Sequence, residues 1–204
     1  MLNDKFPFVR REAVYALGEV GSVKAIPALV KLLDKDKDKE VKAAIVVAFG
    51  KIGNIATVSS LNSILRKKPK FSKAFMRRSA ARSIGQIAQK LQSRKRALTT
   101  PESFLPPKYK TPPPSRTANL TNTFPVFAEV NKTLVKVISN KKETDDVRRE
   151  ASFALGEIGN AESIEQLKKN LNSEDYYLVE ISKEALLKTN RNNMVMESND
   201  ESKT

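Results

Sequence analysis

The stretch VRREAVYALGEVG, Val9 to Gly21, recurs almost unchanged as VRREASFALGEIG, Val147 to Gly159, and ten of the thirteen positions are identical. Within each copy the apolar residues fall at i, i+4, i+7, i+8 and i+11, which is one stripe of an α-helix and not the alternation of a strand. The glycines near the end of each copy, Gly18 with Gly21 and Gly156 with Gly159, predict a helix end followed by a tight turn.

Weaker copies of this helix occur elsewhere in the chain. VKAAIVVAFGKIG spans 41–53 and MRRSAARSIGQIA spans 76–88, while a degraded copy, LVEISKEALLK, spans 178–188. A second amphipathic segment follows or precedes each copy, at 25–33, 57–65, 126–138 and 163–171. The spacing between copies is that of a two-helix repeat, so we predict an all-α chain of stacked helical hairpins.

These residues resemble the HEAT-like repeats first named from phycobilisome lyases. The matching motifs are Asp4, Val9-Arg10, Ala16-Leu17-Gly18 and Ala25-Ile26, and again Asp146-Val147-Arg148, Ala154-Leu155-Gly156 and Ile164. The resemblance covers about 1–87 and 126–188 and implies an α-solenoid of about four to five HEAT-type hairpins. It is specific for the repeat and unspecific for function, because bilin lyases, DNA glycosylases and many scaffolds share the unit.

Charge and proline divide the chain into four parts. Fifteen Lys or Arg and one acid, Glu102, lie between Arg66 and Arg116, so this segment carries the whole formal net charge of +14. Seven of the ten prolines lie in 89–125, where we predict an irregular, basic loop. We therefore expect N-terminal HEAT-like repeats at 1–88, this insertion at 89–125, C-terminal HEAT-like repeats at 126–188 and a disordered polar tail at 189–204.

The composition excludes most catalytic devices. The chain has no Cys and no His, so thiol nucleophiles, imidazole chemistry and Cys/His metal sites are absent. We predict no catalytic, metal or cofactor site. In the resembling family the first Arg of each pair, Arg10 or Arg148, bonds loop Asp and carbonyl groups. The predicted partner-binding residues are the other basic side chains of the repeats and insertion: Arg11, Lys67, Lys68, Arg77, Arg78, Arg82, Arg94, Lys95, Arg96 and Arg149.

The leading prediction for function is a non-catalytic HEAT-repeat scaffold that binds an acidic protein, as part of a larger complex, through its concave face and basic insertion. One alternative is a bilin lyase subunit or phycobilisome-associated factor, with a bilin as cofactor. The other is a nucleic-acid-binding HEAT protein, which rests on charge alone. No signal peptide or membrane span is recognisable, so we expect a cytoplasmic or stromal protein. The first hairpin lacks its first helix, which predicts either an open flank for another chain or a longer solenoid.

Overall fold

The fold of the described residues consists of helices joined by short turns. The computed structural model describes residues 1–97 and 119–200, with side chains at 1–93 and 119–189. Ten α-helices occur in this part of the chain, and the all-α prediction is confirmed. They are α1 (Pro7–Val20), α2 (Ile26–Lys35), α3 (Lys39–Ile52), α4 (Val58–Leu65), α5 (Ala74–Ala97), α6 (Leu120–Thr123), α7 (Val126–Ser139), α8 (Asp145–Ile158), α9 (Ile164–Asn170) and α10 (Tyr176–Asp200). Short 3-10 turns precede α2, α4, α5 and α9.

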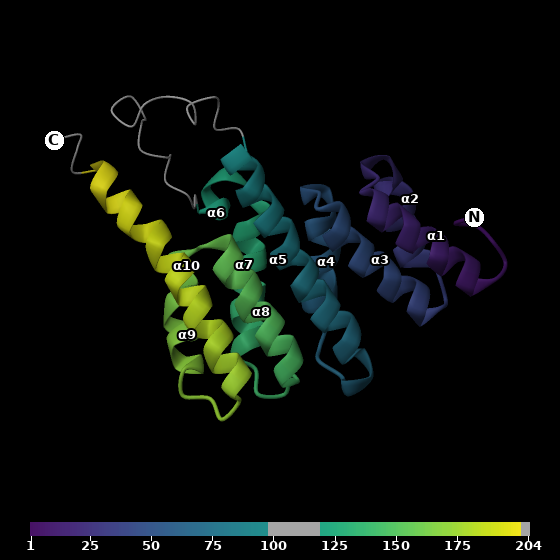
Figure 1. The fold of residues 1–204 in the computed structure, drawn as a ribbon. Helices are drawn as coiled ribbons and strands as arrows, with labels where there is room; N and C mark the ends of the chain where they lie inside the picture. Colours follow the sequence, from purple (N-terminus) through teal and green to yellow (C-terminus); the bar gives the residue numbers. More distant parts are fainter. Residues whose placement is uncertain (98–118, 201–204) are drawn as a thin grey trace.

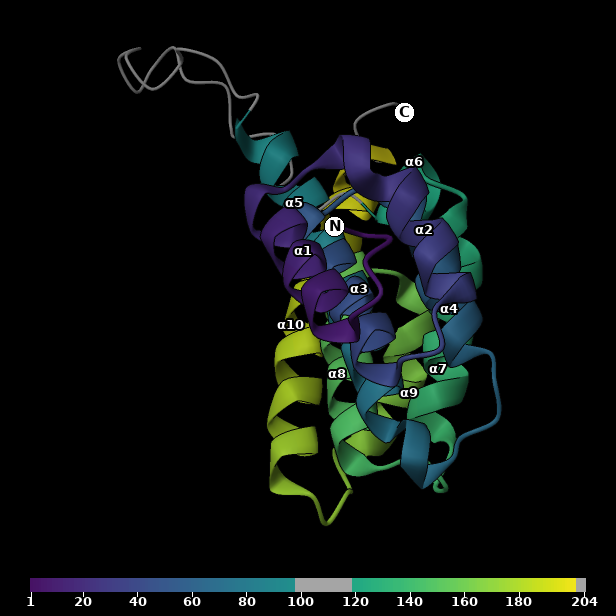
Figure 2. The same ribbon diagram turned by 90° about the vertical axis from the view of Figure 1, so that its right-hand side faces the viewer.

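The helices form two rows. Helices α1, α3, α5, α8 and α10 pack side by side in this order, and α2, α4, α7 and α9 form the second row (Figures 1 and 2). The hairpins of the described chain are therefore α2 with α3, α4 with α5, α7 with α8, and α9 with α10. Because each hairpin contacts mainly its neighbours, this is an α-solenoid, as predicted.

The core follows the apolar stripe of the repeated helix. Val41, Ile45 and Phe49 of α3 have no exposed surface, and Val147 and Leu155 are equally buried at the corresponding face of α8. The same holds for Leu29, Leu61, Leu134 and Leu167 in the second row. Each large apolar side chain buried in this way contributes about 1.5–3 kcal/mol, so the rows are held together by a continuous apolar layer.

The glycines of the repeat have two different roles. The last glycine of a copy ends its helix in the left-handed conformation, with φ of 68° at Gly21, 69° at Gly53 and 71° at Gly159. The prediction that Gly18 and Gly156 also mark the helix end was wrong, because both lie inside helices. A Cβ at Gly156 would lie 2.7 Å from the Cα of Ala185 in α10. The inner glycine therefore allows two neighbouring helices of the row to approach closely.

Two predicted boundaries differ from the structure. Helix α5 continues to Ala97, so 89–97 belongs to the helix and not to an irregular insertion. Leu91 maintains the apolar stripe and packs against the core, which explains the extension. Helix α10 continues to Asp200, where a disordered tail from 189 was expected. The rest of the predicted insertion before Asn119, residues 98–118, and residues 201–204 lie outside the described chain.

Candidate protein-binding site

An ion pair joins the start of the first repeated helix to the loop of the next hairpin. Arg10 donates from Nε to Asp36 Oδ2 at 2.7 Å and from Nη2 to Asp36 Oδ1 at 2.9 Å, and also donates to the carbonyl oxygen of Asp4. Asp36 is buried, and the hydrogen bonds from the Arg10 guanidinium lower the pKa of its carboxyl group. Arg10 thus makes the structural contacts that the family resemblance implied.

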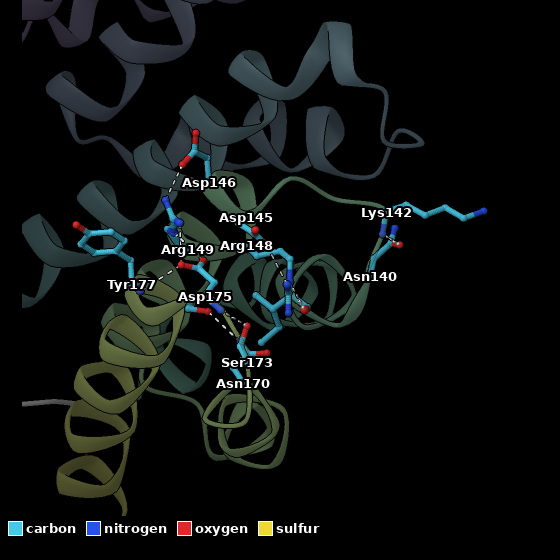
Figure 3. A network of polar contacts seen from close by, with 12 residues as sticks. Asn140, Lys142, Asp145, Asp146, Arg148, Arg149, Asn170, Ser173, Asp175 and Tyr177 are labelled. Atoms are coloured by element: carbon cyan, nitrogen blue, oxygen red, sulfur yellow. Dashed lines mark hydrogen bonds and ion pairs between the residues drawn. The ribbon is translucent and has the colours of Figure 1, made fainter.

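In the last described hairpins the second Arg of the pair has this role. Arg149 donates to both carboxylate oxygens of Asp175, at 2.8 and 2.7 Å, and its guanidinium lies 5.2 Å from the ring centre of Tyr177 (Figure 3). These bonds lower the pKa of Asp175. Arg148 bonds the carbonyl oxygen of Ile138 and Asp145 instead. Arg149, predicted as a partner-binding residue, is instead held within the fold by the contacts of its guanidinium.

Arg77 is also corrected, from a surface residue to a buried one. Its side chain is 3% exposed and forms an ion pair with Glu143, which is 2% exposed and lies between α7 and α8. Its Nη1 donates to the carbonyl oxygens of Ile64, Leu65 and Lys67. Arg77 therefore joins two hairpins that are separated by the long insertion in the sequence, and its side chain is almost completely buried.

The other predicted arginines of the α1 row form ion pairs across neighbouring helices. Arg11 of α1 bonds Glu40 of α3 at 2.8 Å, and Arg82 of α5 bonds Glu150 of α8 at 2.8 Å. Arg78 lies 3.6 Å from Asp146 and is 41% exposed. These side chains are still partly exposed, yet each has an internal acidic neighbour. Lys188–Glu157 and Lys51–Glu19 extend the same pattern along the row.

The junction between α3 and α5 lacks such a pair. Ion pairs link α1 to α3, α5 to α8, and α8 to α10, but within the described residues none links α3 to α5. At this junction the loop after α4 reads RKKPKFSK, residues 66–73, whereas the corresponding loops supply Asp36, Glu143 and Asp175. Figure 2 shows this loop standing out from the second row, where it leads from α4 to the start of α5. The acidic residue that the other loops supply is thus replaced by Lys and Arg in this loop.

A groove of about 700 Å³ lies beside this loop. Apolar atoms of Leu33, Ile64 and Met76 contribute to its lining, together with Tyr15 and Phe75, whose side chains are 39% and 56% exposed. Its charged lining residues are Arg11, Asp34, Lys39, Glu40, Lys42, Lys67, Lys68, Lys73 and Arg77. The volume lies within the range of about 300–1,000 Å³ that is typical of ligand sites.

The structure thus brings together only some of the predicted partner-binding residues. Lys67, Lys68 and Arg11 line the groove, while Arg78, Arg82 and Arg149 lie farther along the α1 row. Arg94, Lys95 and Arg96 lie on the last part of α5, but their side chains are outside the described ones. Sequence reasoning missed the groove because Tyr15 comes from α1, Leu33 from the α2–α3 hairpin and Phe75 from the α4–α5 hairpin. The one available signal was the loss of the loop acid at 66–73.

Two further kinds of site are absent from the residues that the structure describes. No helix there is long and apolar enough to cross a membrane. No group of three or more acidic side chains there has the arrangement of a metal site.

Comparisons with known proteins agree with the observed fold. The family model for HEAT repeats matches residues 1–85, and the model for the PBS lyase HEAT-like repeat matches residues 147–173. An engineered protein of known structure is similar over 93% of this chain and 46% of its own length, with 20% identity and a TM-score of 0.56. The present chain therefore spans about half the length of that protein.

Two other solved structures give weaker matches. A designed armadillo repeat protein has 18% identity and a TM-score of 0.34, over 92% of this chain and 96% of its own. Human deoxyhypusine hydroxylase has 14% identity and a TM-score of 0.32, over 93% and 82%. The search of curated proteins found no significant match. HEAT-type family models match residues 1–85 and 147–173, and the stacked hairpins of the described chain agree with both, so this chain contains HEAT-like repeats.

Proposed function

We propose that this HEAT-repeat chain is a non-catalytic scaffold that binds an acidic protein through the basic surface around the α4–α5 loop and the end of α5. The observation that carries the proposal is that some basic side chains form internal ion pairs while others do not. Arginines of the α1 row bond internal acids, whereas Lys67, Lys68 and Lys73 form no ion pair with any described residue. Charge without an internal partner is available to an external one.

Two further features support a protein partner. Stacked hairpins provide extended surfaces that suit recognition, and the groove combines apolar side chains with charged ones. Phe71, which begins the 3-10 turn before α5, is 91% exposed, and Phe75 is more than half exposed. Exposed aromatic side chains among cations are typical of recognition surfaces, because such residues bury large area at low entropic cost.

The test is affinity capture by the full chain from lysate of its source organism at physiological salt, with and without nuclease. We expect one stoichiometric acidic protein that remains bound after nuclease treatment. A variant with Arg94, Lys95 and Arg96 all replaced by Glu tests the end of α5. It should retain less of that protein while its melting temperature stays unchanged. Loss of every partner after nuclease treatment would instead favour nucleic-acid binding.

A further inference from the structure

The groove beside the α4–α5 loop has features that define one kind of occupant. We infer that it binds an extended acidic peptide segment whose carboxylates contact Lys67, Lys68 and Lys73 and whose apolar side chain packs between Tyr15 and Phe75. This inference rests on the proposed scaffold function and specifies its site and ligand chemistry.

The first argument is the missing acid. At three other places in the stack a basic side chain of one hairpin bonds a carboxylate from the next loop: Arg10 with Asp36, Arg77 with Glu143, and Arg149 with Asp175. At the α3–α5 junction the position of Arg10 is occupied by Lys42, which donates to the carbonyl oxygen of Asp34 behind it. The loop ahead, residues 66–73, contains Arg66 and four lysines but no acid. A carboxylate from another molecule would supply the charge that the repeat elsewhere supplies internally.

The second argument is the distribution of polarity within the groove. Lys67 and Lys68 are exposed on the loop, and Lys73 lies at the start of α5, whose first turn contains no acid. A positive helix N-terminus adds to the attraction of anions at this end of the groove. Ile64 and Met76 line the same groove. The combination of a cationic edge and an apolar interior suits a carboxylate-bearing segment with an apolar anchor.

The third argument distinguishes a peptide from a nucleic acid. The groove lining also includes the carboxylates of Asp34 and Glu40, beside Lys39 and Lys42, and Glu40 is 75% exposed although it bonds Arg11. A phosphate backbone presents negative charge at every step and would be repelled there. A peptide can place a neutral residue against these acids and its carboxylates against the lysines, so the mixed lining favours a peptide.

The experiment measures binding of fluorescein-labelled peptides to the purified full chain by anisotropy. The probe peptide carries Asp and Glu on both sides of a central Phe-Leu. Its neutral counterpart carries Asn and Gln in their place, and single-stranded oligouridine is the nucleic-acid probe. The groove variant is Lys67→Glu with Lys68→Glu. The matched control is Lys141→Glu with Lys142→Glu, two exposed lysines in the α7–α8 loop, where Lys142 extends into solvent (Figure 3).

We expect the acidic peptide to bind and the neutral peptide to bind at least about tenfold more weakly, because charge pairs at an exposed edge are lost. The groove variant should lose a similar factor, and the control should bind as the unsubstituted chain does. Phe75→Ala should weaken binding of the acidic peptide without changing its salt dependence. Melting temperatures of all variants, measured in parallel, show whether each one folds; if the Glu variant does not, Lys67→Gln with Lys68→Gln replaces it.

Three results would overturn the inference. Equal affinity of the groove variant and the unsubstituted chain would place the peptide elsewhere, while leaving the scaffold proposal to the capture experiment. Tighter binding of oligouridine than of the acidic peptide, lost in the groove variant, would make the groove a nucleic-acid site. Absence of peptide binding to a chain that still captures a stoichiometric acidic protein would show that the scaffold uses another surface.

Discussion

Removal of one member of the buried Arg77–Glu143 pair should destabilise the protein strongly. Both side chains are almost completely buried, so the Glu143→Leu variant leaves the Nε and Nη2 of Arg77 without an acceptor in the fold. An uncompensated buried charge costs about 3–5 kcal/mol. For a chain of this size that loss corresponds to a decrease of roughly 6–20 °C in melting temperature.

The double variant Arg77→Met with Glu143→Leu separates the ion pair from the rest of the site. It removes both charges, but the carbonyl oxygens of Ile64, Leu65 and Lys67 still lose the donor Nη1. The loss of hydrogen bonds to these buried carbonyl oxygens costs about 1–3 kcal/mol, so the double variant should lose much less stability than the two single variants lose in sum. We therefore expect a large coupling energy between the two substitutions.

The assay is urea denaturation followed by circular dichroism for both single variants, the double variant and the unsubstituted chain. The slope of each transition must agree among variants for the free energies of unfolding to be comparable. Glu165→Leu, which removes an exposed pair with Lys169, serves as the surface control and should leave the midpoint unchanged. Additive losses in the double variant, or a loss below about 1 kcal/mol for Glu143→Leu, would refute the reasoning.

The repeated glycines and Asp36 give two further predictions. Alanine favours a helix by about 1 kcal/mol over glycine, but its Cβ at position 156 would lie 2.7 Å from the Cα of Ala185, and at position 18 would lie 3.0 Å from the nearest atoms. Gly156→Ala should therefore be less stable than Gly18→Ala by at least about 1 kcal/mol in thermal melts, and equal stability would contradict the close packing. Asp36 has a pKa below its usual 3.8, so its bond with Arg10 adds stability above that pH and loses it as the pH falls below. The Asp36→Asn variant should accordingly show a smaller fall in melting temperature below about pH 4 than the unsubstituted chain. If the melting temperatures of both proteins fall in parallel with pH, the Arg10–Asp36 pair does not contribute to the pH dependence of stability.

The roles of the predicted arginines show where local pattern was insufficient. Arg11, Arg78 and Arg149 occupy equivalent positions in the repeated helix, and all three were predicted to bind a partner. The structure instead gives Arg149 the bidentate contact that Arg10 makes in the first copy, because Asp175 lies within its reach. A contact between hairpins depends on which acid the next loop presents, and the position of the arginine in its own helix does not specify that.

The sequence by itself determined the helices, their pairing into hairpins and the HEAT-like class. These properties depend on apolar residues at helical spacing, which recur in every copy, and on glycine at the helix end, which three copies have at Gly21, Gly53 and Gly159. The tertiary structure alone decided which basic side chains form internal ion pairs and which remain exposed. Arg77 meets Glu143 only after the insertion has been spanned, and the groove combines Tyr15 of α1, Leu33 of the α2–α3 hairpin and Phe75 of the α4–α5 hairpin. Electrostatic contacts form between atoms near in space, so a site made at the junction of repeats becomes visible only once the repeats are stacked.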